Sequence, residues 1–325
     1  MRLQFTKSRI GRTLAGVVAA AAIVAASNAE AANKPYKLGL MIWNASVPFY
    51  SNLIKGAQDT AKQEGVTVNI QSGNGDLATE ISVVQQFIAQ HVDAILIVPS
   101  DPKGIVPVIK QANKAGIPVL SVNNRADTTS GAELVTHVGV DDVVFGEKQG
   151  EFLAQSIGGK GNVAYIMGKL GTSAQLDRKK GFDEALKKYP DIKVVAAQSA
   201  DWDNAKALAV TQDFLSRNPK GKLAAIVGQG PEGVNGANFA AQQGRTDVKF
   251  ILGDYPADVR NAIIKGTVYG TVDQDPTVQG VFGVKDAVQW LDSGKASGVP
   301  TPNHYLDLPV VTKENVDKFP AAWGE

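Results

Sequence analysis

Aromatic side chains alternate with amide and hydroxyl groups in one short stretch near the start of the chain. Trp43, Asn44 and Ser46 come first, and Phe49 and Tyr50 follow a proline. Aromatic faces beside amide and hydroxyl groups suit a ligand that is partly apolar and partly hydroxylated. A second interpretation, that the two later rings only pack a helix against the protein, stays open at this point.

The residues around this stretch predict a strand, a loop and a helix that would hold these side chains. Leu38–Trp43 is an apolar run with the length of a strand buried on both faces. Pro48 fits the first turn of a helix, where its missing N–H is not needed, and Phe49, Leu53 and Ala57 follow at the spacing of one helix face. In open α/β sheets, ligands bind just beyond the carboxyl ends of the strands. We therefore expect a binding site at this loop.

The alternation of apolar strands and amphipathic helices runs through the chain twice. The further strands expected are, in order, Val66–Gln71, Ala94–Val98, Val119–Val122, Leu134–Val140, Asn162–Met167, Ile192–Ala197, Leu223–Val227 and Lys249–Gly253. This order predicts an α/β protein with two doubly wound, parallel-sheet lobes. The remaining strand Val268–Asp273, helix Val278–Leu291 and extended segment His304–Val311 are too short for a third lobe. We expect them to complete the first two, so that several chain crossings form a multi-strand hinge beside the ligand cleft.

The first residues have the composition of a secretory signal peptide. Four basic residues precede the apolar run Leu14–Ala26, and Ala29-Glu30-Ala31 has the small-x-small pattern of a cleavage site. The run is too short for a membrane-spanning helix, which needs roughly 20 residues. We expect residues 1–31 to be removed, and the loss of four basic residues and Glu30 changes the formal charge from +1 to −2. Such a balance does not favour nucleic acid as a partner, and the absence of cysteine excludes disulfides and thiol catalysis.

Four motifs at the ends of predicted strands carry a resemblance to a known family. They are Pro48-Phe49-Tyr50, Gly171-Thr172-Ser173 with Arg178, Ala200-Asp201-Trp202-Asp203, and Gln274-Asp275-Pro276. In this order they resemble the periplasmic sugar-binding proteins of ABC importers, of the ribose-binding type. The resemblance covers Lys37–Val311.

The resemblance implies a fold, a function and a set of partners. The fold is that of a type 1 periplasmic binding protein, with one lobe from residues 32–139 and 276–306 and the other from 140–274 and 308–325. The function is to close on a sugar or polyol and deliver it to the permease of an ABC transporter, in the periplasm, without catalysis, cofactor or metal. A chemoreceptor is an open second partner, and the protein is expected to be a monomer.

The ligand-binding residues follow from the same resemblance, position by position. The expected set is Trp43, Asn44, Phe49, Tyr50, Asn123, Asn124, Arg178, Trp202, Gly230, Asp254, Tyr255 and Gln274. In this set Arg178 supplies a fixed fork of donors, and the amides both donate and accept. We expect Arg178→Ala to weaken ligand binding about tenfold or more, while the melting temperature of the ligand-free protein stays nearly unchanged.

The sequence departs from the family pattern at several of these positions. Asn123-Asn124 replaces an Asp-Arg pair, Gly230-Pro231-Glu232 replaces Asn-Asp-Glu, and Val47 replaces an amide before the proline. The aspartate expected after the next strand corresponds to Asp254 or, by register, to Tyr255. These departures argue against ribose itself. A polyol, another sugar or a small hydroxylated compound stays open.

Other interpretations of individual motifs carry less weight. Gly228–Gly233 matches the dinucleotide pattern G-x-G-x-x-G after a strand, but Pro231 removes a backbone donor, which favours a ligand-facing loop. His91, His137 and His304 lie far apart in the chain and are expected at the surface or the hinge, so metal or triad chemistry is not expected. A transcriptional regulator would need an N-terminal helix-turn-helix where the leader stands, and an exported enzyme would need an acid, base or nucleophile cluster.

Overall fold

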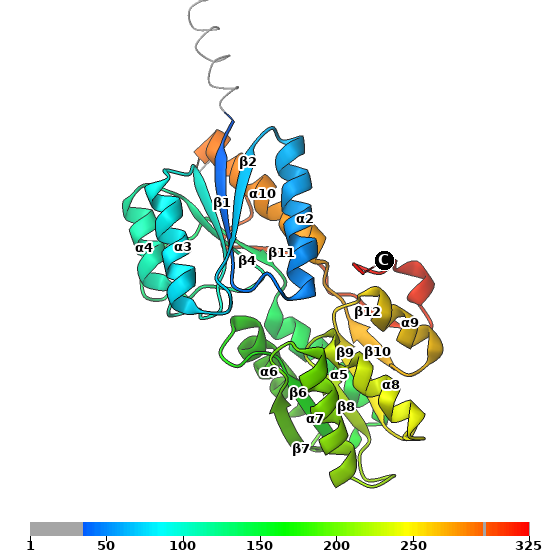
Figure 1. The fold of residues 1–325 in the computed structure, drawn as a ribbon. Helices are drawn as coiled ribbons and strands as arrows, with labels where there is room; N and C mark the ends of the chain where they lie inside the picture. Colours follow the sequence, from blue (N-terminus) through cyan, green and yellow to red (C-terminus); the bar gives the residue numbers. More distant parts are fainter. Residues whose placement is uncertain (1–34, 295–296, 325) are drawn as a thin grey trace, which may run out of the picture. The chain divides into compact units, whose positions relative to one another are not determined.

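The computed structural model describes residues 35–294 and 297–324, so the expected signal peptide lies outside the described residues. Lys37–Glu325 forms one compact unit, which contains two six-stranded sheets (Figure 1). No helix in the described ranges is long and apolar enough to cross a membrane. The two sheets confirm the predicted α/β fold with two parallel sheets.

The first sheet has the strand order β11-β5-β4-β3-β1-β2, with all neighbours parallel. Its strands are β1 (Lys37–Ile42), β2 (Thr67–Ser72), β3 (Ala94–Val98), β4 (Val119–Val122), β5 (His137–Gly139) and β11 (Asn303–Tyr305). The helices that follow or cover them are α2 (Pro48–Gln63), α3 (Leu77–Ala89), α4 (Val106–Lys114) and α10 (Pro276–Ser293). The apolar side chains of β1 and β3 are fully buried, as expected for strands covered on both faces.

The second sheet repeats this arrangement with the order β12-β10-β9-β8-β6-β7. Its strands are β6 (Lys160–Met167), β7 (Asp191–Ser199), β8 (Ala225–Gly228), β9 (Lys249–Gly253), β10 (Gly270–Val272) and β12 (Val310–Thr312). Its helices are α5 (Asp142–Ile157), α6 (Ser173–Leu186), α7 (Asn204–Arg217), α8 (Val234–Gln242) and α9 (Ala257–Lys265), with 3-10 turns η1 (Pro231–Gly233) and η3 (Val316–Lys318). Only β12 runs antiparallel to its neighbour in this sheet.

Three details differ from the sequence-based expectations. The strand expected over Leu134–Val140 is reduced to β5, and the segment His304–Val311 is divided into two strands that join different sheets. The second difference follows from Pro309, which has no N–H for a continuous ladder. Helix α9 was not predicted, although Val259, Ala262 and Ile263 have helical spacing and are buried. The helix begins at Ala257, directly after Pro256. Because proline is typical of turns, the helical spacing that follows it was not recognised.

Within the described residues the chain passes between the two sheets at three places. It leaves β5 of the first sheet for α5, which packs on α6; it leaves β10 of the second sheet for α10, which packs on α2; and it joins β11 to β12. The hydrophobic cluster of Val140, Phe145, Val272 and Leu308 joins these crossings. The hinge expected from the sequence would lie at these crossings.

Two helix pairs make unusually close contacts through glycines. A Cβ atom on Gly56 or Gly280 would collide with the backbone of the opposite helix in the pair α2–α10, which lie side by side in Figure 1. In the pair α5–α6, a Cβ on Gly146 would collide with the backbone of Arg178, and one on Gly181 with the backbone oxygen of Val143. The second close approach brings the arginine of α6 against the first turn of α5.

Candidate functional site

A cavity of about 330 Å³ lies beyond the carboxyl ends of strands from both sheets. The residues predicted for the site that line it are Phe49, Tyr50, Asn123, Asn124, Arg178, Trp202, Asp254 and Gln274. They lie in loops that follow strands of both sheets and near the starts of the covering helices, and these segments are distant in sequence. The structure therefore brings most of the predicted set together.

The first sheet contributes an aromatic pair whose orientation is fixed by a short relay of hydrogen bonds. Val47 is extended, as required before a proline, and α2 then places Phe49 and Tyr50 in its first turn. The indole Nε1 of Trp43 donates to the Tyr50 hydroxyl at 2.7 Å, and this hydroxyl donates to Oδ1 of Asn123 at 3.0 Å. Burial raises the pKa of Tyr50, so its hydroxyl remains a donor. The relay leaves Nδ2 of Asn123 without an acceptor among the described residues, and hence able to donate to a ligand.

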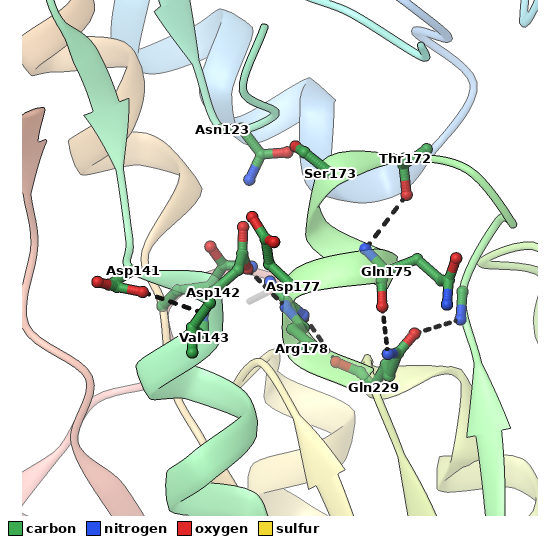
Figure 2. Close-up of polar contacts among 12 residues, drawn as sticks. Asn123, Asp141, Asp142, Val143, Thr172, Ser173, Gln175, Asp177, Arg178 and Gln229 are labelled. Atoms are coloured by element: carbon green, nitrogen blue, oxygen red, sulfur yellow. Dashed lines mark hydrogen bonds and ion pairs between the residues drawn. The ribbon is translucent and has the colours of Figure 1, made fainter. Parts of the chain in front are cut away.

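Arg178 is the most heavily constrained residue of the site. Its Nε donates to Asp142 at 2.8 Å, its Nη1 donates to the carbonyl of Gln229 at 2.7 Å, and Nη1 lies 3.7 Å from Asp254. Figure 2 shows the side chain directed toward Asp142 and Gln229. Its guanidinium carbon also lies 3.8 Å from the ring centre of Phe145.

Burial would lower the pKa of Arg178, but the two carboxylates beside it outweigh that effect and raise it, so the group stays charged. The side chain is only 2% exposed. The charged neighbours Asp177, Lys179 and Lys180 would suggest a solvated helix face here, but for Arg178 that interpretation is wrong. The expectation that Arg178→Ala leaves the melting temperature nearly unchanged also loses its basis. Removal of the guanidinium group would leave the buried carboxylates of Asp142 and Asp254 without their partner.

Asp254 is the main acceptor from the second sheet. It follows β9, and its Oδ1 accepts a hydrogen bond from Nε2 of Gln274 at 2.9 Å. Gln274 in turn accepts one from Gln279 at 2.8 Å, which fixes the orientation of its amide. Burial raises the pKa of Asp254 to about 6, although Arg178 and Gln274 act in the opposite direction. Its second carboxylate oxygen has no hydrogen bond within the described ranges and is free for a ligand.

Trp202 provides an aromatic face from the second sheet. Its ring packs directly against the backbone of Gly168. A Cβ atom at this position would overlap the indole, so the close packing requires glycine there. The guanidinium of Arg178 lies 5.8 Å from the ring centre. Trp202 has a left-handed backbone (φ 60°), which is rare for a large side chain. Such strain is typical of functional positions held by their surroundings.

Four residues of the predicted set do not line the cavity. Trp43 lies behind Tyr50 and acts through it, and Asn44 instead accepts hydrogen bonds from Ser46. Tyr255 is fully buried in the core of the second sheet, so the structure selects Asp254 at this register. Gly230 has no side chain to offer, and its place is taken by a neighbour.

That neighbour is Glu232, which sequence reasoning did not include in the site. A Cβ on Gly230 would lie 2.6 Å from the Glu232 carboxylate, so the missing side chain makes room for this group to line the cavity. Burial raises the pKa of Glu232 to about 8, Asp254 and Asp203 act in the same direction, and Arg178 opposes them. In the described part of the chain no other residue donates a hydrogen bond to this carboxyl group.

Other lining residues were also missed. They are Val47, Pro48, Ala174, Asn204, Pro231, Pro256, Ala257, Asp258, Trp323 and Gly324. The departure at Gly230 was the one signal that pointed to Glu232. Nothing in the local sequence around Trp323 indicates that this late segment returns to the site.

The structure also tests the other motifs. In Gly228–Gly233 the spaces that Cβ atoms at Gly230 and Gly233 would occupy are filled by Glu232 and Leu252, so the loop offers no cradle for a pyrophosphate. His137 is buried against Ser121 rather than at the surface, and burial lowers its pKa to about 3. His304 pairs with Asp286. Among residues 35–294 and 297–324, no group of three or more acidic, histidine or cysteine residues is placed to hold a metal ion.

Residues 38–296 match the family model described as a periplasmic binding protein domain. The chain belongs to this family. It is 33% identical to the xylitol-binding protein of Mycolicibacterium smegmatis over 95% of this chain and 87% of the relative. It is 31% identical to the ribose import binding protein RbsB of Escherichia coli, over 93% of this chain and 99% of the relative.

Solved structures agree with this assignment. An ABC transporter periplasmic solute-binding protein of Actinobacillus succinogenes with bound D-allose has a TM-score of 0.79 and 30% identity, covering 88% of this chain and all of that one. These relatives are binding proteins and not enzymes. The resemblance to ribose-type binding proteins is thereby confirmed.

Proposed function

We propose that this protein closes around an uncharged sugar or polyol in the periplasm and delivers it to the permease of an ABC transporter. The observation that carries the proposal is the cavity itself, in which aromatic faces from both sheets stand beside fixed donors and acceptors. Sugars and polyols have apolar C–H faces for the rings and hydroxyl groups for the polar side chains. The ligands in the names of the relatives, xylitol, ribose and D-allose, all have this chemistry.

The charges around the cavity support a ligand without an acidic group. Among the described residues that line the cavity, Arg178 is the one basic residue, and it is already paired with Asp142. Asp254, Glu232 and Asp258 are the acidic residues of the lining. A sugar phosphate or sugar acid would bring a further negative charge into a site whose described lining residues include no unpaired basic side chain, which is unfavourable.

Closure and export complete the proposal. The lobes defined by residues 32–139 with 276–306 and 140–274 with 308–325 move about the three crossings and enclose the ligand between them. Residues 1–31 direct the chain to the periplasm and are removed there. No catalytic step is required, because the transporter's ATPase supplies the energy.

A thermal-shift screen of the purified protein tests the ligand class. Xylitol, D-ribose, D-allose and myo-inositol are compared with D-ribose 5-phosphate and D-gluconate, and a ligand at 100 times its Kd adds about 2.7 kcal/mol of stability. A neutral compound should raise the melting temperature and the two anions should not. Stabilisation by the anions alone would refute the proposal. Sequencing of the periplasmic protein should begin at Ala32, and an intact leader on cytoplasmic protein would refute the export step.

A further inference from the structure

The end of the chain returns to the cavity from outside the two repeated units. After η3 the chain runs along the loop between β9 and α9, where the N–H of Ala322 donates to the carbonyl of Tyr255 at 2.9 Å. The N–H of Ala257 donates to the carbonyl of Trp323 at 2.8 Å, and Pro256 forms a β-bridge with Trp323. Terminal residues are usually poorly ordered unless they are tied down. Here the backbone of Trp323 is tied to the loop that leads from β9 of the second sheet into α9, close in sequence to Asp254.

The ring of Trp323 contacts a residue of the first sheet's helices. It is 8% exposed and lines the cavity. Its centre lies 5.4 Å from that of Phe49 with an interplanar angle of 83°, an edge-to-face contact. Phe49 makes a similar contact with Tyr50 at 5.3 Å. Trp323 therefore has its backbone on one side of the cleft and its ring against an aromatic residue from the other.

Resting on the proposed function, we propose that Trp323 is a ligand-contacting residue that closes one end of the cavity and restricts it to small ligands. The ring adds a further aromatic surface to those of Phe49, Tyr50 and Trp202. Its contact with Phe49 joins the two sides of the cleft, so it also slows the escape of a bound ligand. A purely structural ring that anchored the terminal segment would affect stability without changing which ligands bind.

The test compares three purified variants with the wild type. Trp323→Ala removes the ring, Trp323→Phe keeps an aromatic face, and Trp290→Ala removes an indole from α10, outside the cavity. Calorimetric titrations use xylitol, D-ribose, D-allose and myo-inositol as small probes, with maltitol and sucrose as oversized ones. Dissociation rates come from stopped-flow fluorescence, and melting temperatures are measured without ligand.

We expect Trp323→Ala to weaken binding of the best small probe about tenfold or more, mainly through faster dissociation. Trp323→Phe should stay within about threefold and Trp290→Ala within about twofold of the wild type. The ratio between the affinities for small and for oversized probes should decrease in Trp323→Ala and stay unchanged in the other two variants. Unchanged affinity and selectivity in Trp323→Ala overturn this inference while the proposed function stands. A wild type that binds none of the small probes overturns both.

Discussion

Replacement of Arg178 by alanine is the most informative single change in this protein. The substitution removes the partner of Asp142, the hydrogen bond to the Gln229 carbonyl and the nearest positive charge to Asp254. The carboxylates stay buried, because they are held by α5 and by the loop after β9. The change should therefore affect both the stability of the protein and its affinity for ligand.

The size of the stability effect follows from burial. Removing one partner of a buried ion pair costs about 3–5 kcal/mol, because the other charge is left without compensation. With an unfolding entropy of about 2.1 cal/mol/K per residue, a chain of this size should lose roughly 5–8 °C in melting temperature. Ligand affinity should fall about tenfold or more, since hydrogen bonds to a charged donor contribute about 1.5–3 kcal/mol.

Arg217 provides a matched control. Its Nε donates to Asp213 at 2.8 Å, the same distance as between Arg178 and Asp142, but its side chain is 74% exposed. Exposed pairs contribute about 0.2–1 kcal/mol, so Arg217→Ala should change the melting temperature by at most about 1–2 °C. Scanning calorimetry of the ligand-free variants measures this difference, and titration calorimetry measures affinity.

A double-mutant cycle isolates the pair. If Arg178 stabilises the protein through Asp142, the loss of unfolding free energy in the double variant Arg178→Ala/Asp142→Ala should be clearly smaller than the sum of the losses in the two single variants. Equal small losses for Arg178→Ala and Arg217→Ala would refute the reasoning. So would simple additivity in the cycle.

Two further changes test the close helix pair and the cavity carboxyl. Gly181→Ala should destabilise the protein by about 1–3 kcal/mol, because the added methyl group meets the backbone of Val143 and separates α5 from α6; an unchanged denaturation midpoint would contradict this close approach. The pKa of Glu232 is raised by burial to about 8, so between its ordinary pKa and pH 8 the folded state keeps a proton that the unfolded state has released. The ligand-free protein should therefore lose stability as the pH rises from about 6.5 to 8.5, and denaturant titrations of Glu232→Gln should show a smaller loss; an identical pH profile for this variant would be evidence against the buried carboxyl.

The sequence predicted the fold well because the inner strands of both sheets, such as β3 and β8, are short apolar runs with a breaker at their end. Ala94–Val98 is an example, and the structure buries all of it. Prediction failed where the signal was weak or composite. The segment around Leu306 and Pro309 looked like one extended piece, although its two halves pair with different sheets and with opposite strand directions.

For the site, motifs at strand ends pointed to the correct loops but not always to the correct side chain. Local sequence patterns cannot show that the missing side chain of Gly230 lets the Glu232 carboxylate line the cavity, since this depends on the three-dimensional packing around the two residues. They also cannot show that the indole of Trp323 meets Phe49, which lies far away in the chain. The burial of Arg178 was missed for a similar reason. Its neighbours in sequence are charged, whereas its neighbours in space are Asp142 and Phe145.

Three residues that line the cavity share a left-handed backbone, which indicates that their surroundings hold them in place. Asn123, Trp202 and Asp254 have φ angles of 60°, 60° and 61°, and each follows a strand at its carboxyl end. A non-glycine residue keeps such a conformation when its surroundings fix it. The Tyr50 hydroxyl fixes Asn123 and the Gln274 amide fixes Asp254. The free donor of Asn123 and the free acceptor of Asp254 thus have set directions, so the positions of a ligand's hydroxyl groups, more than its charge, should decide which sugar or polyol binds.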